Sequence, residues 1–107
     1  MKLAIIISTA DAETNWNAFR LANLALKHND EVKIFLIGKG VEYEKSASEK
    51  FNIKEQLEKF LGFPKARILA CRTCLEIRGQ KETKTCPMNS IEDLYSLIKE
   101  SDRIINF

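Results

Sequence analysis

The sequence predicts an α/β protein, a three-layer α/β/α sandwich built around a mainly parallel sheet of about five strands. Apolar, β-branched runs such as "KLAIIIS" at 2–8 alternate along the chain with segments whose apolar residues recur at helical spacing. These runs are nearly uninterrupted, which is typical of strands buried on both faces of a parallel sheet. Strands that alternate with helices favour βαβ units, with helices on both faces of the sheet.

Each strand is expected where an apolar run is bounded by polar residues. Four strands are expected at 2–8, 32–38, 66–70 and 103–107. A short edge strand is expected within the polar segment 80–87, whereas 39–51 reads as a loop or a loose helical turn.

Four helices are expected, each with a recognisable N-cap. The first covers 15–28 after a cap at Asp11 or Thr14, and the second begins after Asn52 and ends at Gly62. A short third helix is expected from Cys74, because Thr73 and Glu76 fit a capping box. Ser90 should cap the last helix, whose inward residues are expected to be Ile91, Leu94, Leu97 and Ile98.

Composition indicates a single globular domain spanning 1–107, with 45% hydrophobic and 30% charged residues. The net charge of +2 is scattered, so no nucleic-acid surface is expected. The apolar stretch 3–7 is too short for a signal peptide, and no segment approaches a membrane span, so no membrane association is expected. We therefore expect a cytoplasmic protein, in which closely spaced cysteines are more often catalytic or metal-binding than structural.

Two of the three cysteines, Cys71 and Cys74, lie in "ILACRTCLEIRG" at 68–79, where a predicted strand meets a short helix. Functional sites in open α/β sheets lie beyond the carboxyl ends of the strands. A helix N-terminus there lowers the pKa of a thiol, and Arg72 or Arg78 could add positive potential. Cys71 and Cys74 are therefore the candidate catalytic residues.

Three other interpretations of this pair remain open at the level of the sequence. The cysteines could be buried core residues, or half of a zinc site, although only Cys86 and His28 could complete it. They could also form a redox disulfide, since C-x-x-C near a βαβ pattern is a cue for thiol redox chemistry. Cys86 precedes Pro87 in a polar loop and is expected to be accessible, without an assigned role.

The segments "ACRTCLEIRG" and "SIEDLYSLIKESDRIINF", together with the opening "KLAIIIST", resemble the DsrE/DsrF-like family of sulfur-relay proteins. The resemblance implies a five-stranded parallel sheet, assembly into oligomers such as trimers or hexamers, and a cysteine that accepts persulfide sulfur. In relay members that cysteine lies eight residues before the glycine of an R-G pair, which from Gly79 is Cys71. Cys74 matches the second cysteine of the short C-x-x-C members.

The leading hypothesis is a cytoplasmic, sulfurtransferase-type carrier that holds persulfide sulfur on Cys71 and needs no metal or organic cofactor. Its expected partners are a sulfur donor, a sulfur acceptor and further copies of the chain. One alternative is a dithiol redox or redox-sensing module that uses a Cys71–Cys74 disulfide, and another is a non-catalytic oligomeric binding protein. Four aromatic residues near segment ends could line an interface between copies or fill the core: Trp16, Tyr43, Phe51 and Phe63.

Overall fold

The computed structural model describes residues 1–107 and contains one five-stranded sheet in which all strand pairs are parallel. The strands are β1 (Lys2–Ile7), β2 (Glu31–Leu36), β3 (Ala66–Cys71), β4 (Met88–Asn89) and β5 (Arg103–Asn106). Their order in the sheet is β4-β3-β2-β1-β5. The predicted α/β fold with a parallel five-stranded sheet is therefore confirmed.

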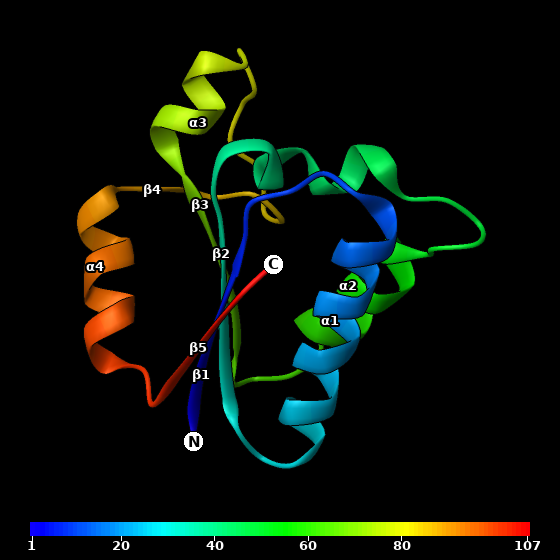
Figure 1. Ribbon diagram of the computed structural model, residues 1–107, viewed down its shortest axis with the longest axis vertical. Coiled ribbons are helices and arrows are strands. Elements are labelled where there is room, and N and C mark those ends of the chain that lie inside the picture. Colours follow the sequence, from blue (N-terminus) through cyan, green and yellow to red (C-terminus); the bar gives the residue numbers. More distant parts are fainter.

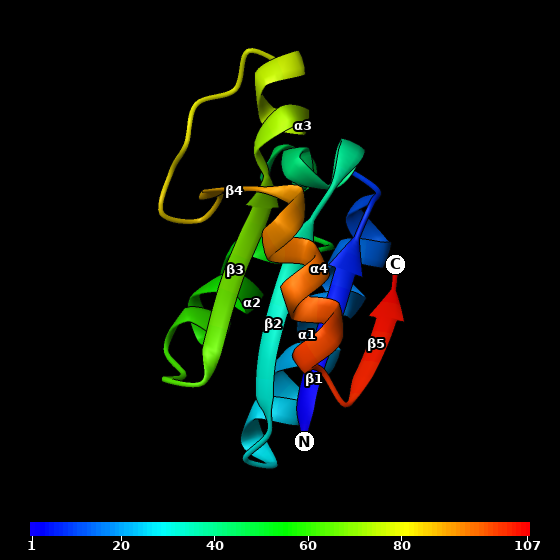
Figure 2. The ribbon, with the colours of Figure 1, turned by 90° about the vertical axis from the view of Figure 1, so that its left-hand side faces the viewer.

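Helices cover both faces of this sheet. On one face lie α1 (Ala12–Lys27) and α2 (Ile53–Leu61), and on the other lies α4 (Ile91–Glu100) (Figure 1). The 3₁₀ segment η1 (Gly38–Ser46) and the short helix α3 (Arg72–Ile77) lie beyond the carboxyl ends of β2 and β3 (Figure 2). None of the helices has the length and apolar character needed to span a membrane.

The alternation of side chains along the strands divides the core into two layers. In β1, Leu3, Ile5 and Ile7 belong to the large cluster between the sheet and helices α1 and α2. Ala4 points the other way and packs with Leu97 of α4 in a smaller cluster. The strands are thus buried on both faces, which explains their uninterrupted apolar sequences.

The helix caps agree with most of the expected boundaries. The Asp11 carboxylate accepts the N–H of Thr14 at 2.9 Å, and Asn52 Oδ1 accepts the N–H of Glu55 at 3.1 Å. At α4, Ser90 and Asp93 form a reciprocal capping box. These caps start α1, α2 and α4 at the residues after Asp11, Asn52 and Ser90.

The prediction of an edge strand within 80–87 is wrong in position. This segment is a loop whose Thr83 and Cys86 form an isolated antiparallel bridge, and the edge strand β4 follows it. The Tyr43 hydroxyl donates a 2.6 Å hydrogen bond to the Thr85 carbonyl, which ties the loop to η1. This partly buried hydrogen bond holds the segment as a loop, since its polar sequence has little preference for a strand.

Fewer residues of α4 face the core than predicted. Leu97 is buried, but Ile91 and Ile98 are 61% and 41% exposed. Because α4 is the only helix on its face of the sheet, residues that flank its contact stripe have no second helix to pack against.

Candidate functional site

Cys71 occupies the junction between β3 and α3, as the last residue of the strand and the N-cap of the helix. Its backbone is extended (φ −68°, ψ 115°), and its Sγ accepts the backbone N–H of Cys74 at 3.3 Å. The expected cap at Thr73 is therefore wrong: the helix begins at Arg72, because the Cys71 sulfur already satisfies an N–H of the first turn. The expected position at the carboxyl edge of the sheet is what the structure shows.

Cys74 brings a second sulfur into direct contact with the first. The two Sγ atoms lie 2.6 Å apart, and both side chains are half-buried with free thiols. A disulfide bond is about 2.05 Å long. The two sulfurs are therefore close but not bonded, in a position that suits sulfur–sulfur chemistry.

Gly38 fixes the Cys74 sulfur from the side of β2, because its backbone N–H donates to Cys74 Sγ at 3.2 Å. Gly38 has φ +57°, a conformation that residues with a Cβ rarely adopt. Sequence analysis did not identify this residue as part of the site. A glycine as the last residue of the strand predicted at 32–38 was the available signal, but nothing in the sequence indicated which side chain its N–H would reach.

The pKa of the Cys71 thiol is raised, contrary to the sequence-based expectation. Burial is the largest cause, and the Cys74 side chain adds to it through its hydrogen bond and its charge. The N–H groups of Cys74 and Thr73 lower the pKa but do not prevail. Since α3 has only six residues, its dipole is short, and it does not overcome the loss of water around the sulfur.

Arg78 couples α3 to η1 and adds no free positive charge at the sulfurs. Its Nε lies 2.9 Å from Glu42 Oε1, and its Nη1 donates to the Cys74 carbonyl at 3.1 Å. Arg72 is exposed. The expected electrostatic role of Arg78 is thus replaced by a structural one, in which its charge is balanced by Glu42.

Cys86 is buried, which corrects the expectation that it is accessible. Its side chain belongs to the main core at 1% exposure, and its Sγ lies 3.7 Å from the Val41 carbonyl. Burial and the nearby Glu44 carboxylate raise the pKa of the Cys86 thiol to about 11. The loop around it is polar, but the hydrogen bond from Tyr43 to Thr85 draws this part of the loop against the core.

The residues considered for a zinc site do not come together. No group of three or more His, Cys, Asp or Glu side chains is arranged to hold a metal ion. His28 is the C-cap of α1 and precedes the start of β2, whereas Cys71 is the last residue of β3, and Cys86 belongs to the core cluster. The structure thus assembles Cys71 and Cys74 without the other two candidate ligands.

Comparison with known proteins places this geometry in a family. The model of the DsrE/DsrF-like family matches residues 1–107, the whole length of the chain. The chain belongs to the DsrE/DsrF-like family. The resemblance noted in "ACRTCLEIRG" and the C-terminal segment is therefore confirmed.

Two archaeal relatives extend over nearly all of this DsrE/DsrF-like chain. A protein of Methanocaldococcus jannaschii, described as uncharacterized, is 33% identical over 115 residues, with 100% of both chains covered. One from Methanopyrus kandleri, also described as uncharacterized, is 34% identical over 113 residues, covering 98% of this chain and 93% of its own. The crystal structure of YchN from E. coli matches with a TM-score of 0.81 at 20% identity over 100% of both chains, which shows the shared fold.

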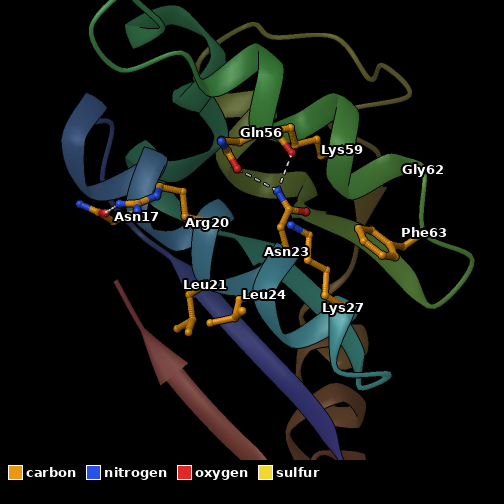
Figure 3. Close-up of a pocket in the computed structure, with 10 residues that line it drawn as sticks. All are labelled: Asn17, Arg20, Leu21, Asn23, Leu24, Lys27, Gln56, Lys59, Gly62 and Phe63. Carbon is orange, nitrogen blue, oxygen red and sulfur yellow. Dashed lines mark hydrogen bonds between the residues drawn. The ribbon is translucent and has the colours of Figure 1, made fainter.

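A groove of about 820 Å³ in this DsrE/DsrF-like chain lies between α1 and α2 (Figure 3). Asn23 lines the groove, and its Nδ2 donates to the Gln56 carbonyl and to Gln56 Oε1, both at 3.0 Å. Of the cations at its rim, Lys59 is paired with Glu55 at 3.2 Å and Arg20 stacks over Trp16. No cysteine lines the groove, so Cys71 and Cys74 lie outside it.

Proposed function

We propose that the protein is a cytoplasmic sulfur-relay protein that receives persulfide sulfur on Cys71 and passes it to an acceptor. Membership of the DsrE/DsrF-like family favours this role. The observation that carries it is the position of Cys71, which is half-exposed at the carboxyl end of β3 with a hydrogen-bonded sulfur. Sites in parallel α/β sheets gather at this edge.

The transfer needs only a thiolate and a donor persulfide. Cys71 Sγ attacks the outer sulfur of R–S–SH, the donor's S–S bond breaks, and the donor leaves as the thiolate RS⁻. Cys71 then carries –S–SH, and an acceptor nucleophile attacks its outer sulfur in the second half of the cycle. No metal or organic cofactor takes part, and the partners are a donor and an acceptor protein.

The raised pKa of Cys71 lowers the rate of this transfer at neutral pH. Little Cys71 is thiolate at neutral pH, so the group is a slow nucleophile toward small reagents. A protein donor that docks over α3 and η1 can hold its persulfide against Cys71 and offset the low thiolate population by proximity.

A dithiol redox function is the second candidate, and one observation favours it. The 2.6 Å separation of the sulfurs of Cys71 and Cys74 suits formation of an intramolecular disulfide. A module of this kind would cycle between dithiol and disulfide without gaining sulfur. A non-catalytic binding protein would do neither, so mass measurements separate the three functions.

We also propose that the protein assembles as a homo-oligomer through α4. The aromatic residues first considered give little support, because Tyr43 is fully buried against Phe19, and Trp16 packs on Phe51. Ile91, Tyr95 and Ile98 instead form an exposed apolar stripe at helical spacing along α4. Exposed apolar patches of this kind mark interaction surfaces.

Intact-mass measurement on the Cys74→Ser variant tests the relay function, because this variant lacks the thiol that could remove the added sulfur. After treatment with an aryl thiosulfonate as sulfur donor at alkaline pH, where the Cys71 thiolate forms, we expect a gain of one sulfur atom that a reductant reverses. The Cys71→Ser variant should gain none, and Cys86→Ser should behave as the native chain. No sulfur gain in Cys74→Ser would rule out the relay function.

A further inference from the structure

The contact between the two sulfurs has a chemical consequence once Cys71 carries a persulfide. Cys74 Sγ lies 2.6 Å from Cys71 Sγ, which becomes the inner sulfur of the Cys71–S–SH group. The outer sulfur is one bond further along the side chain. Cys74 is the only other thiol at the site, because Cys86 is buried in the core.

We propose that, when no acceptor is docked, sulfur received on Cys71 leaves the protein as sulfide, because Cys74 attacks the inner sulfur of the Cys71 persulfide. This inference rests on the proposed loading of Cys71, and it assigns Cys74 a separate, reductive activity. The Gly38 N–H, 3.2 Å from Cys74 Sγ, holds the attacking sulfur in place. Arg78 supports the same arrangement through its hydrogen bond to the Cys74 carbonyl.

The step balances in atoms and electrons. The Cys74 thiolate supplies the electron pair of a new bond to Cys71 Sγ, and the bond between Cys71 Sγ and the outer sulfur breaks. The outer sulfur departs with that electron pair as HS⁻, and the Cys71–Cys74 disulfide remains. The two thiols lose two electrons in total, which reduce the sulfane sulfur to sulfide.

The disulfide must be reduced before the next cycle. A dithiol reductant can do this by thiol–disulfide exchange, through a mixed disulfide with one of the two cysteines. Their half-exposed position leaves a sulfur accessible for that exchange. The protein therefore fits between a reaction that generates sulfane sulfur and one that consumes sulfide, with a dithiol as the electron source.

The test treats the reduced protein anaerobically, at alkaline pH where the Cys71 thiolate forms, with benzenethiosulfonate, whose by-product is a sulfinate and not a thiol or sulfide. Free sulfide and intact mass are then measured together. For the native chain we expect one sulfide per protein and a mass loss of two hydrogens. Cys74→Ser should keep the added sulfur and release sulfide only at background level, whereas Cys86→Ser should match the native chain.

The outcomes separate the two proposals. If the native chain keeps the added sulfur and releases no sulfide, the reductive step is wrong and the relay function stands. A disulfide that forms without sulfide release also overturns the inference, because it indicates direct oxidation. If neither the native chain nor Cys74→Ser takes up sulfur or releases sulfide, the relay function fails, and the inference fails with it.

Discussion

The Sγ atoms of Cys71 and Cys74 lie 2.6 Å apart, and each also accepts a backbone N–H, from Cys74 and from Gly38 respectively. At this distance a negative charge on the Cys74 sulfur disfavours a second charge on Cys71, and together with burial it raises the pKa of the Cys71 thiol.

The pH dependence of Cys71 alkylation follows from this coupling. Because burial and Cys74 raise the pKa of Cys71, the midpoint should lie above the ~8.5 of an ordinary thiol. Alkylation at pH ~7 should then be slower than its high-pH plateau by a factor on the order of thirty or more. Rates can be followed by mass spectrometry, and a midpoint between pH ~6 and ~7 would contradict the raised pKa.

Removing the second thiol should shift this midpoint downward. The Cys74 side chain raises the pKa of Cys71 through its hydrogen bond and its charge. Serine stays neutral, so in Cys74→Ser the Cys71 thiolate meets no second charge and its pKa falls. An unchanged midpoint in this variant would show that the Cys74 side chain does not affect the pKa of Cys71, and a higher midpoint would show that it lowers the pKa; either result would contradict the prediction.

Cys86 should behave as a core residue. In the native protein it should resist alkylation, and it should react once the chain is unfolded in urea, because only 1% of it is exposed. Cys86→Ser should lower the free energy of unfolding by about 1–2 kcal/mol, since it buries a hydroxyl in place of the sulfur. Equal alkylation rates in the native and unfolded protein would contradict this position.

The bridge from Arg78 to Glu42 and to the Cys74 carbonyl should hold Cys74 in place. Arg78→Lys removes the planar fork that serves both acceptors, so we expect about 1 kcal/mol lower stability and faster alkylation of Cys74. Arg72→Lys is the matched control, because Arg72 is exposed on the same helix. Equal alkylation rates of Cys74 in the two variants would show that Arg78 does not position Cys74.

Light scattering tests the oligomer proposed through α4. The native chain should be larger than a monomer at micromolar concentration, and Tyr95→Glu should shift it toward the monomer by placing a charge in the apolar stripe. Ser96→Glu is the control, because Ser96 is exposed on the same helix but lies away from the stripe. A monomeric native chain would exclude the assembly.

The parts of the fold predicted correctly depend on local signals. The apolar run of β1 and the caps at Asp11, Asn52 and Ser90 are encoded within a few neighbouring residues. The positions of Cys71 and Cys74 at the carboxyl edge follow from strand–helix alternation, which determines where each strand ends.

The errors involve contacts between residues far apart in the sequence. Burial of Cys86 depends on Tyr43, and the hydrogen bond to Cys74 Sγ comes from Gly38, 36 residues earlier. The raised pKa of Cys71 depends on the packing around it, whereas the sequence shows only the cap. The exposure of Ile91 and Ile98 likewise depends on how many helices cover that face of the sheet.

The central claim, that Cys71 is the residue that carries sulfur, can be tested by peptide mapping. Trypsin cleaves after Arg67, Arg72 and Arg78, so it places Cys71 in peptide 68–72 and Cys74 in peptide 73–78. The Cys71→Ser and Cys74→Ser variants are treated with the sulfur donor, alkylated and digested side by side. We predict one extra sulfur on peptide 68–72 of Cys74→Ser and none on peptide 73–78 of Cys71→Ser; the reverse pattern would contradict the assignment.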